Sequence, residues 1–196
     1  MTVVFFDLET GGLEDHHPDI QLAAIAVNEE SWSELSSFEA KIQFDEAKAD
    51  PEALKVNHYD AAEWARVALP PAQVVERFGR FLNQFKSLSM VSKRTGNPYM
   101  VAKLAGHNGD RFDGPRLQRL FKAHERFLPA DPRVRCTAQR AMWYFDERGL
   151  LPPEDYKLAT LCRYFQIDVA GAHDALTDVR LAAKLAQAMA PRGKQP

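Results

Sequence analysis

The strongest constraint on the fold is an apolar run at residues 20–27, which predicts a central strand covered on both faces. Two further strands are expected at 3–9, ended by a Thr-Gly-Gly turn, and at 38–44, where apolar and polar residues alternate. Short links join the three segments. They therefore predict an antiparallel meander.

The rest of the chain carries mainly helical patterns. Helices are predicted at 51–56, from Pro70 through Phe85, from just after Asp113 to Phe127, and at 138–145, 158–165 and 175–189. A strand is expected at 99–105 and a short one near 134–136, and 86–98 is interpreted as a basic loop. Strands first and helices later, with a strand–helix–strand portion between them, predict an α/β sheet domain. We expect one domain over 1–190 and a flexible tail at 191–196.

Composition gives the chain no general affinity for polyanions, because its net charge is -2 over 196 residues. The N-terminal apolar run is too short to span a membrane, and no leader pattern precedes it, so we expect a cytoplasmic protein. The two cysteines, Cys136 and Cys162, fit no metal-ligand spacing. We interpret them as reduced core thiols, with one disulfide as the alternative.

Two acidic residues mark the end of the first predicted strand. Asp7 and Glu9 are two positions apart, so their side chains share one face of the strand, with Cα atoms roughly 6.6 Å apart. Two like charges at the end of a core strand repel each other unless a cation bridges them. The alternative is a solvated strand end that carries two ordinary acids.

Two later segments add acids and a histidine. Asp113 precedes a helix, so it is either a helix cap or a site residue, and Asp110 competes with it for the second role. Asp178 lies on the apolar stripe of the last helix, unless it is only a first-turn acid favoured by the helix dipole. His173 comes five residues earlier, either beside this site or as a solvated loop residue.

Taken together, these residues predict a metal site. Carboxylate oxygens suit Mg²⁺ or Mn²⁺ better than Zn²⁺. Two such ions roughly 4 Å apart can activate water and stabilise a leaving oxygen in phosphodiester hydrolysis. A histidine with a pKa near neutrality can take the proton of that water.

Three motifs resemble the DEDDh subgroup of the proofreading-type 3′→5′ exonucleases. They are Phe6-Asp7-Leu8-Glu9-Thr10, the segment from His107-Asn108 to Asp113, and His173-x-Ala175-Leu176-x-x-Asp178. The resemblance covers residues 3 to about 187. The second motif is most similar to the three-prime repair exonucleases, because it has one residue more than proofreading subunits before Phe112-Asp113. His58 departs from the pattern, since many relatives carry glycine there.

The resemblance implies a ribonuclease H-like fold, a central mixed five-stranded sheet flanked by helices. It implies that Asp7, Glu9, Asp113 and Asp178 hold two Mg²⁺ or Mn²⁺ ions and that His173 is the general base. Substrate contacts are implied for Thr10, Gly11, Gly12, Leu13, Asn108 and Arg111. Further basic residues either follow a nucleic-acid backbone or are solvated; they are Lys86, Lys93, Arg94, Lys103, Arg116, Arg119, Lys122 and Arg126. We interpret Arg119, Lys122 and Arg126 as a solvated helix face.

These expectations converge on a metal-dependent 3′→5′ exonuclease that releases nucleoside 5′-monophosphates from single-stranded or frayed 3′ ends of DNA. An exoribonuclease of the same superfamily is the alternative, because contacts to the 2′-OH cannot be identified from sequence. A third interpretation is a non-catalytic nucleic-acid-binding module, which the loss of a site residue would favour. All five site residues are present in this sequence: Asp7, Glu9, Asp113, His173 and Asp178. A homodimer and a polymerase are considered as further partners.

Overall fold

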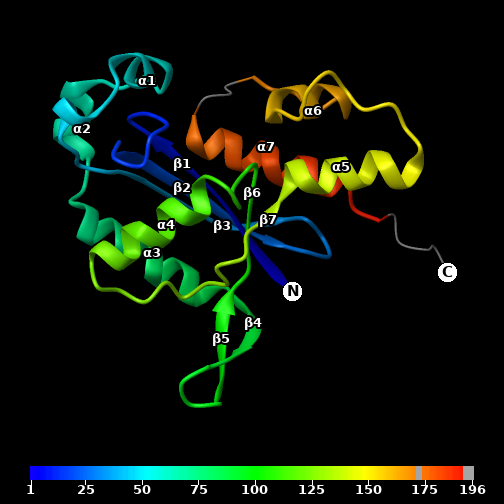
Figure 1. The fold of residues 1–196 in the computed structure, drawn as a ribbon, viewed down its shortest axis with the longest axis horizontal. Coiled ribbons are helices and arrows are strands. Elements are labelled where there is room, and N and C mark those ends of the chain that lie inside the picture. The colour runs from blue at the N-terminus through cyan, green and yellow to red at the C-terminus, as the bar shows by residue number, and fades with distance from the viewer. Residues whose placement is uncertain (171–173, 192–196) are drawn as a thin grey trace.

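A computed structural model describes residues 1–170 and 174–191. Within these residues, one mixed sheet of five strands has the order β3-β2-β1-β6-β7, and a second sheet pairs β4 with β5 (Figure 1). The strands are β1 Thr2–Thr10, β2 Asp19–Asn28, β3 Glu34–Lys41, β4 Lys86–Val91, β5 Pro98–Ala102, β6 Leu104–Gly106 and β7 Arg135–Cys136. The helices are α1 Pro51–Val56, α2 Ala61–Val67, α3 Pro71–Gln84, α4 Asp113–Ala123, α5 Thr137–Arg148, α6 Leu158–Tyr164 and α7 Ala175–Ala188.

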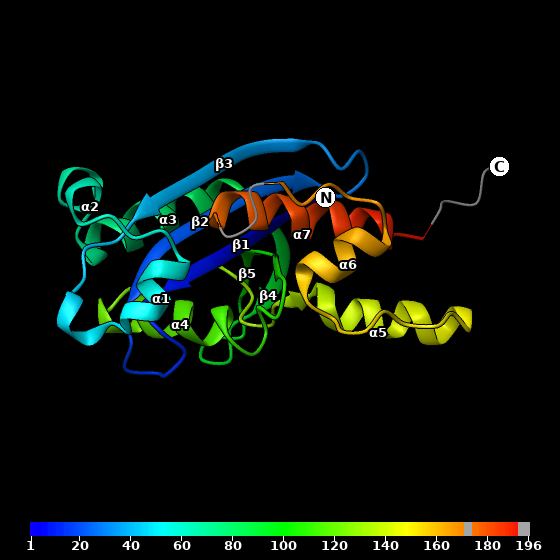
Figure 2. The same ribbon diagram turned by 90° about the horizontal axis from the view of Figure 1, so that it is seen from above.

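Both faces of the five-stranded sheet are covered, because successive side chains of a strand point to opposite faces. On one face, Val4, Phe6 and Leu8 of β1 pack in a core with apolar residues of α3 and α4. On the other face, Val3 and Phe5 pack with residues of α7. A further apolar cluster joins α5, α6 and α7 at one end of the molecule (Figure 2).

The expected meander is confirmed, since β1 pairs antiparallel with β2 and β2 with β3, while β6 runs parallel to β1. The run at 20–27 is buried on both faces, as predicted. The third strand lies at Glu34–Lys41 rather than 38–44. Ile42 instead forms an isolated bridge to Leu69, although its amide still donates to the Ile20 carbonyl of β2 at 2.8 Å.

The predicted loop at 86–98 is wrong. Residues 86–91 form β4, which pairs antiparallel with β5 to make a hairpin that projects from the body of the protein (Figure 1). The predicted strand at 99–105 is consequently divided at Lys103, whose ammonium group binds Glu29 at 2.8 Å. The composition of 86–98 suggested a loop, but the alternation of serine with Leu88 and Met90 was the strand signal.

The helix predictions are otherwise close to the structure. Helix α2 was missed, although the Asp60 carboxylate accepts a hydrogen bond from the Glu63 backbone amide as an N-cap. Helix α4 ends at Ala123, four residues before the predicted Phe127. Both cysteines are buried free thiols, as expected. In the described part of the chain, no helix is long and apolar enough to cross a membrane.

Candidate active site

Four acidic residues predicted from the sequence meet where β1, α4 and α7 come together. Asp7 and Glu9 lie in the last part of β1, Asp113 is the first residue of α4, and Asp178 lies in the first turn of α7. The amide of Leu8, between the two β1 acids, donates a hydrogen bond to Asp113 Oδ1 at 3.3 Å. Asp113 therefore binds the strand and does not cap its own helix, whose N-cap is Phe112.

The four acids lie close enough to perturb one another's pKa values. Burial raises the pKa of Asp7 well above its usual value, and the neighbouring Asp113, Glu9 and Asp178 raise it further. Burial, with Asp178 and Asp113, raises the pKa of Glu9 to about 7. Burial also raises the pKa of Asp113 to about 7, although the bond from Leu8 opposes this. Each carboxylate is thus costly to ionise without a compensating cation.

This donor set fits a hard divalent cation. The donors are carboxylate oxygens, as Mg²⁺ and Mn²⁺ prefer, and a bound cation would bring the raised pKa values back down. Among residues 1–170 and 174–191, no three His, Cys, Asp or Glu side chains are already grouped as a formed metal site. The four acids therefore share an electrostatic field without forming a closed set of ligands.

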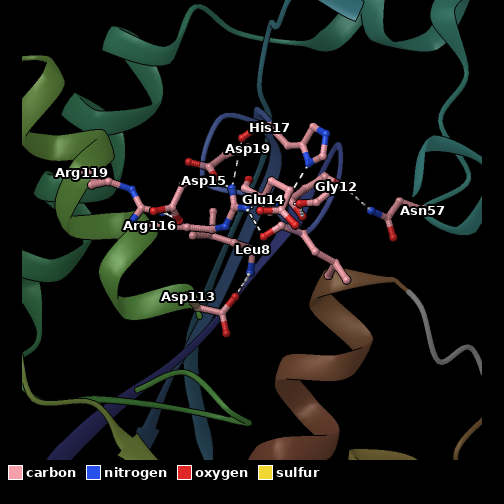
Figure 3. A network of polar contacts seen from close by, with 12 residues as sticks. Leu8, Gly12, Glu14, Asp15, His17, Asp19, Asn57, Asp113, Arg116 and Arg119 are labelled. Atoms are coloured by element: carbon pink, nitrogen blue, oxygen red, sulfur yellow. Dashed lines mark hydrogen bonds and ion pairs between the residues drawn. The ribbon is translucent and has the colours of Figure 1, made fainter. Parts of the chain in front are cut away.

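A buried arginine organises the loop that follows β1 (Figure 3). Arg116 of α4 is 3% exposed, and its guanidinium donates to the carbonyl oxygens of four loop residues: Gly12 and Leu13 at 3.2 Å, Glu14 at 2.7 Å and His17 at 3.1 Å. It also pairs with Asp19 at 3.2 Å. Both alternatives given for Arg116, contact with a nucleic-acid backbone and a solvated side chain, are therefore wrong, because the side chain is buried and bonded inside the protein.

The same loop is held from two other directions. Thr10 Oγ1 donates to the Gly12 carbonyl at 2.8 Å, and the side-chain Nδ2 of Asn57, after α1, donates to the Thr10 carbonyl at 2.8 Å. Gly12 has a φ of +149°, and a Cβ there would lie 2.2 Å from His17 Nδ1. Glycine is thus required at position 12 by both conformation and space.

A pocket of about 410 Å³ opens between this loop, β1 and α1. Its lining residues are Leu8, Glu9, Thr10, Gly12, Leu13, Asp50, Glu52, Ala53, Val56, Asn57 and Phe112. Leu13 is 81% exposed, although it is apolar, and stands at the rim. Of the predicted metal residues only Glu9 lines this pocket, together with the predicted substrate residues Thr10, Gly12 and Leu13. Sequence reasoning did not assign the Phe112 wall.

Other predicted residues lie elsewhere. Asn108, with a φ of +56°, and Arg111 are exposed and do not line this pocket. Asp110, the competitor of Asp113, faces α5, where Oδ2 accepts a hydrogen bond from Gln139. His173 lies outside the described residues.

Two further histidines, His107 and His58, lie away from the four acids. His107 is held between Thr137 Oγ1 and the Tyr156 carbonyl, each at 2.9 Å, and burial lowers its pKa. His58 has a φ of +51°, which explains why glycine would be the easier residue at this helix end. Neither ring joins the four acids.

Solved structures share this fold. E. coli exonuclease I in complex with a dT13 oligonucleotide gives a TM-score of 0.72 at 19% identity, over 95% of this chain and 40% of that one. The zinc-bound form of the E. coli enzyme with single-stranded DNA gives 0.73 at 20% identity, over 99% and 41%. A complex of exonuclease I with SSB-Ct gives 0.71 at 18% identity, over 95% and 40%.

The comparison confirms the expected ribonuclease H-like arrangement, a mixed five-stranded sheet flanked by helices. At such identities the likeness establishes the fold alone. The chain spans about 40% of the length of these structures. No protein-family model matches the chain, and no curated protein matches its sequence.

Proposed function

We propose that this protein is a metal-dependent 3′→5′ exonuclease that hydrolyses DNA and releases nucleoside 5′-monophosphates. The observation that carries the proposal is the meeting of Asp7, Glu9, Asp113 and Asp178 from three elements, with raised pKa values for the first three. Asp113 is buried and the other three acids are half-buried. Acids held this close together destabilise the fold and are typical of functional sites.

Each acid has a role in the proposed chemistry. Asp7, Glu9 and Asp178 would hold Mg²⁺ or Mn²⁺, with Asp113 completing the oxygen donors directly or through water. Two such ions would supply an activated water and stabilisation of the leaving oxygen. His173 would accept the proton of the attacking water, as general bases of this type do.

The pocket beside Glu9 would receive the terminal nucleotide. Gly12 lines this pocket, and Leu13 at its rim would wedge against the last base. Gly11 is buried and does not line it, because a Cβ at Gly11 would lie 2.7 Å from the side chain of Ala49. Arg116 would act from behind by fixing the carbonyl groups of this loop. Asn108 and Arg111 are exposed, so any contact they make would be with nucleic acid that extends beyond the pocket.

DNA is favoured as the substrate because E. coli exonuclease I, which has this fold, is seen in complexes with DNA oligonucleotides. An exoribonuclease remains the alternative. A homodimer and a polymerase partner stay predictions of the sequence, as does the cytoplasmic location.

The decisive experiment is digestion of a 5′-labelled single-stranded DNA with Mg²⁺, beside an EDTA control and an RNA of the same sequence. We expect a ladder that shortens from the 3′ end, that EDTA abolishes and that is stronger on DNA. A stronger ladder on RNA would select the exoribonuclease. Absence of cleavage on both would favour the non-catalytic module.

Two variants test the assigned roles. Asp7→Asn should remove turnover while the protein remains folded.

His173→Ala should slow the chemical step by roughly 10²–10⁴-fold, the usual contribution of a general base. An unchanged single-turnover rate would remove His173 from that role.

A further inference from the structure

The β4–β5 hairpin has a fixed position beside the end of α4. The segment after α4 runs along its base, where the Ala102 amide donates to the Pro129 carbonyl and the Asp131 amide to the Ala102 carbonyl, each at 2.9 Å. In Figure 1 this segment passes the foot of the projecting hairpin. The hairpin and the end of α4 therefore present one composite surface.

That surface exposes a large aromatic side chain. Phe127 is 69% exposed, and its ring meets the ring of Tyr99 on β5 edge to face at 6.2 Å. It lines three hollows, of about 340, 470 and 570 Å³. Val91 and Met100 of the hairpin are also exposed. Packing of the protein itself does not account for this apolar surface.

The same surface is rich in positive charge. Six exposed cations line the hollows around Phe127, and one of them, Arg80, pairs with Glu76. The other five make no ion pair with any residue that the structure describes; they are Lys86, Lys93, Arg94, Lys122 and Arg126. Two acids also line the hollows, Glu125 and Glu76, and the second pairs with Arg80. We call the five cations with Tyr99 and Phe127 the hairpin patch.

Helix α4 connects the hairpin patch with the active site. It begins at Asp113 and has 11 residues, so its ends are about 16 Å apart at 1.5 Å per residue. Arg119 and Lys122 are exposed along it, and Arg119 pairs with the exposed Asp15. A span of about 16 Å corresponds to roughly five nucleotides of a strand that stays stacked, at the 3.4 Å rise of duplex DNA, and to fewer in an extended strand.

We infer that the hairpin patch is a second contact surface for single-stranded nucleic acid whose 3′ end lies in the active site. The inference rests on the proposed function. Bases would stack on Phe127 and Tyr99, and the cations would bind phosphates, a combination that holds single strands without reading sequence. The unpaired positive charge favours a polyanion over a protein, in a chain whose net charge is -2.

The test measures how affinity depends on oligonucleotide length. In an Asp7→Asn background, fluorescence anisotropy with Mg²⁺ would compare single strands of about four and about 15 nucleotides, within the range of known single-strand sites. Phe127→Ala should weaken binding of the longer strand roughly tenfold, the value of one lost stacking contact, and of the shorter one less than twofold.

A double variant tests the cations separately. Lys122→Gln with Arg126→Gln should reduce the slope of log K against log[salt] by about 1.4 for the longer strand, at about 0.7 per phosphate contact. The matched controls are Trp143→Ala, whose side chain is 68% exposed outside the patch, and Arg163→Gln on α6; neither should change the length dependence. If Phe127→Ala lowers the melting temperature, its binding result is set aside and the Lys122→Gln, Arg126→Gln variant alone decides whether the patch binds nucleic acid.

The possible failures can be told apart. If the patch variants lose equal affinity for both strand lengths, or lose none, while the Asp7→Asn protein without patch substitutions binds both strands, the hairpin patch is overturned and the proposed function stands. Unaltered oligonucleotide binding with loss of a co-purifying protein in the patch variants would overturn it in favour of a protein partner. No binding of either strand, or no digestion by wild type, would overturn the proposed function instead.

Discussion

At the scale of single residues, the raised pKa of Asp7 makes the site a source of instability that depends on pH. An acid whose pKa is raised in the folded state does not lower the free energy of unfolding when the pH is below its unfolded-state pKa of about 4. As the pH rises the free energy of unfolding falls, and the loss is complete above the folded-state pKa, which is about 7 for the neighbouring Glu9. In EDTA, Asp7→Asn should therefore become progressively more stable than wild type between pH 4 and pH 8. Thermal melts across this range check it; a constant difference would contradict it.

Arg116 makes a second prediction at this scale. Its guanidinium donates hydrogen bonds to four carbonyl groups and pairs with Asp19. Arg116→Gln should therefore lower the free energy of unfolding by about 3–5 kcal/mol, the usual penalty for breaking a buried ion pair. Arg116→Lys should not restore the loop, because one ammonium group cannot reproduce the fork of donors. Urea denaturation and KM measure the two effects. A Lys variant with wild-type KM would show that the loop does not depend on this network.

At the scale of elements, the turn after β1 predicts an asymmetry between two glycines with positive φ. Gly12→Ala combines strain with a contact at 2.2 Å to His17, whereas Gly96→Ala at the hairpin turn meets nothing within 4 Å. Gly96→Ala should lower the free energy of unfolding by about 1–2 kcal/mol and leave catalysis intact. Gly12→Ala should lower the free energy of unfolding further and raise KM severalfold. Equal effects in melting and kinetic assays would argue against a packed loop.

The elements also show what the sequence could predict. Period-two and helical spacing are local, so they located β1, β2, α3 and α7 and placed Asp7 and Glu9 on one strand face. The role of Arg116 was not accessible, because its partners lie about a hundred residues earlier in the chain. The hairpin was mistaken for a loop because basic residues, Gly96 and Pro98 are spread over 86–98, while strand pairing cannot be recognised from composition.

At the scale of the whole molecule, a bound cation should stabilise the entire fold, because the site joins both faces of the sheet. A ligand present at about 100 times its Kd adds about 2.7 kcal/mol to the free energy of unfolding. For a chain of 196 residues this corresponds to a rise in Tm of roughly 5–10 °C. Melts at pH 8 with Mg²⁺ or Mn²⁺ against EDTA check this, with Asp7→Asn as the control. An unchanged wild-type Tm would contradict the assigned donor set.

The arrangement of the four acids also bears on how the protein is made. The first strand supplies Asp7 and Glu9, but Asp178 arrives only with α7, which packs across that strand. A nascent chain on the ribosome therefore lacks a complete site until its last described helix has emerged and docked. Under the proposed function, synthesis order alone keeps the enzyme inactive until translation of this segment is complete, and any product truncated before α7 lacks Asp178.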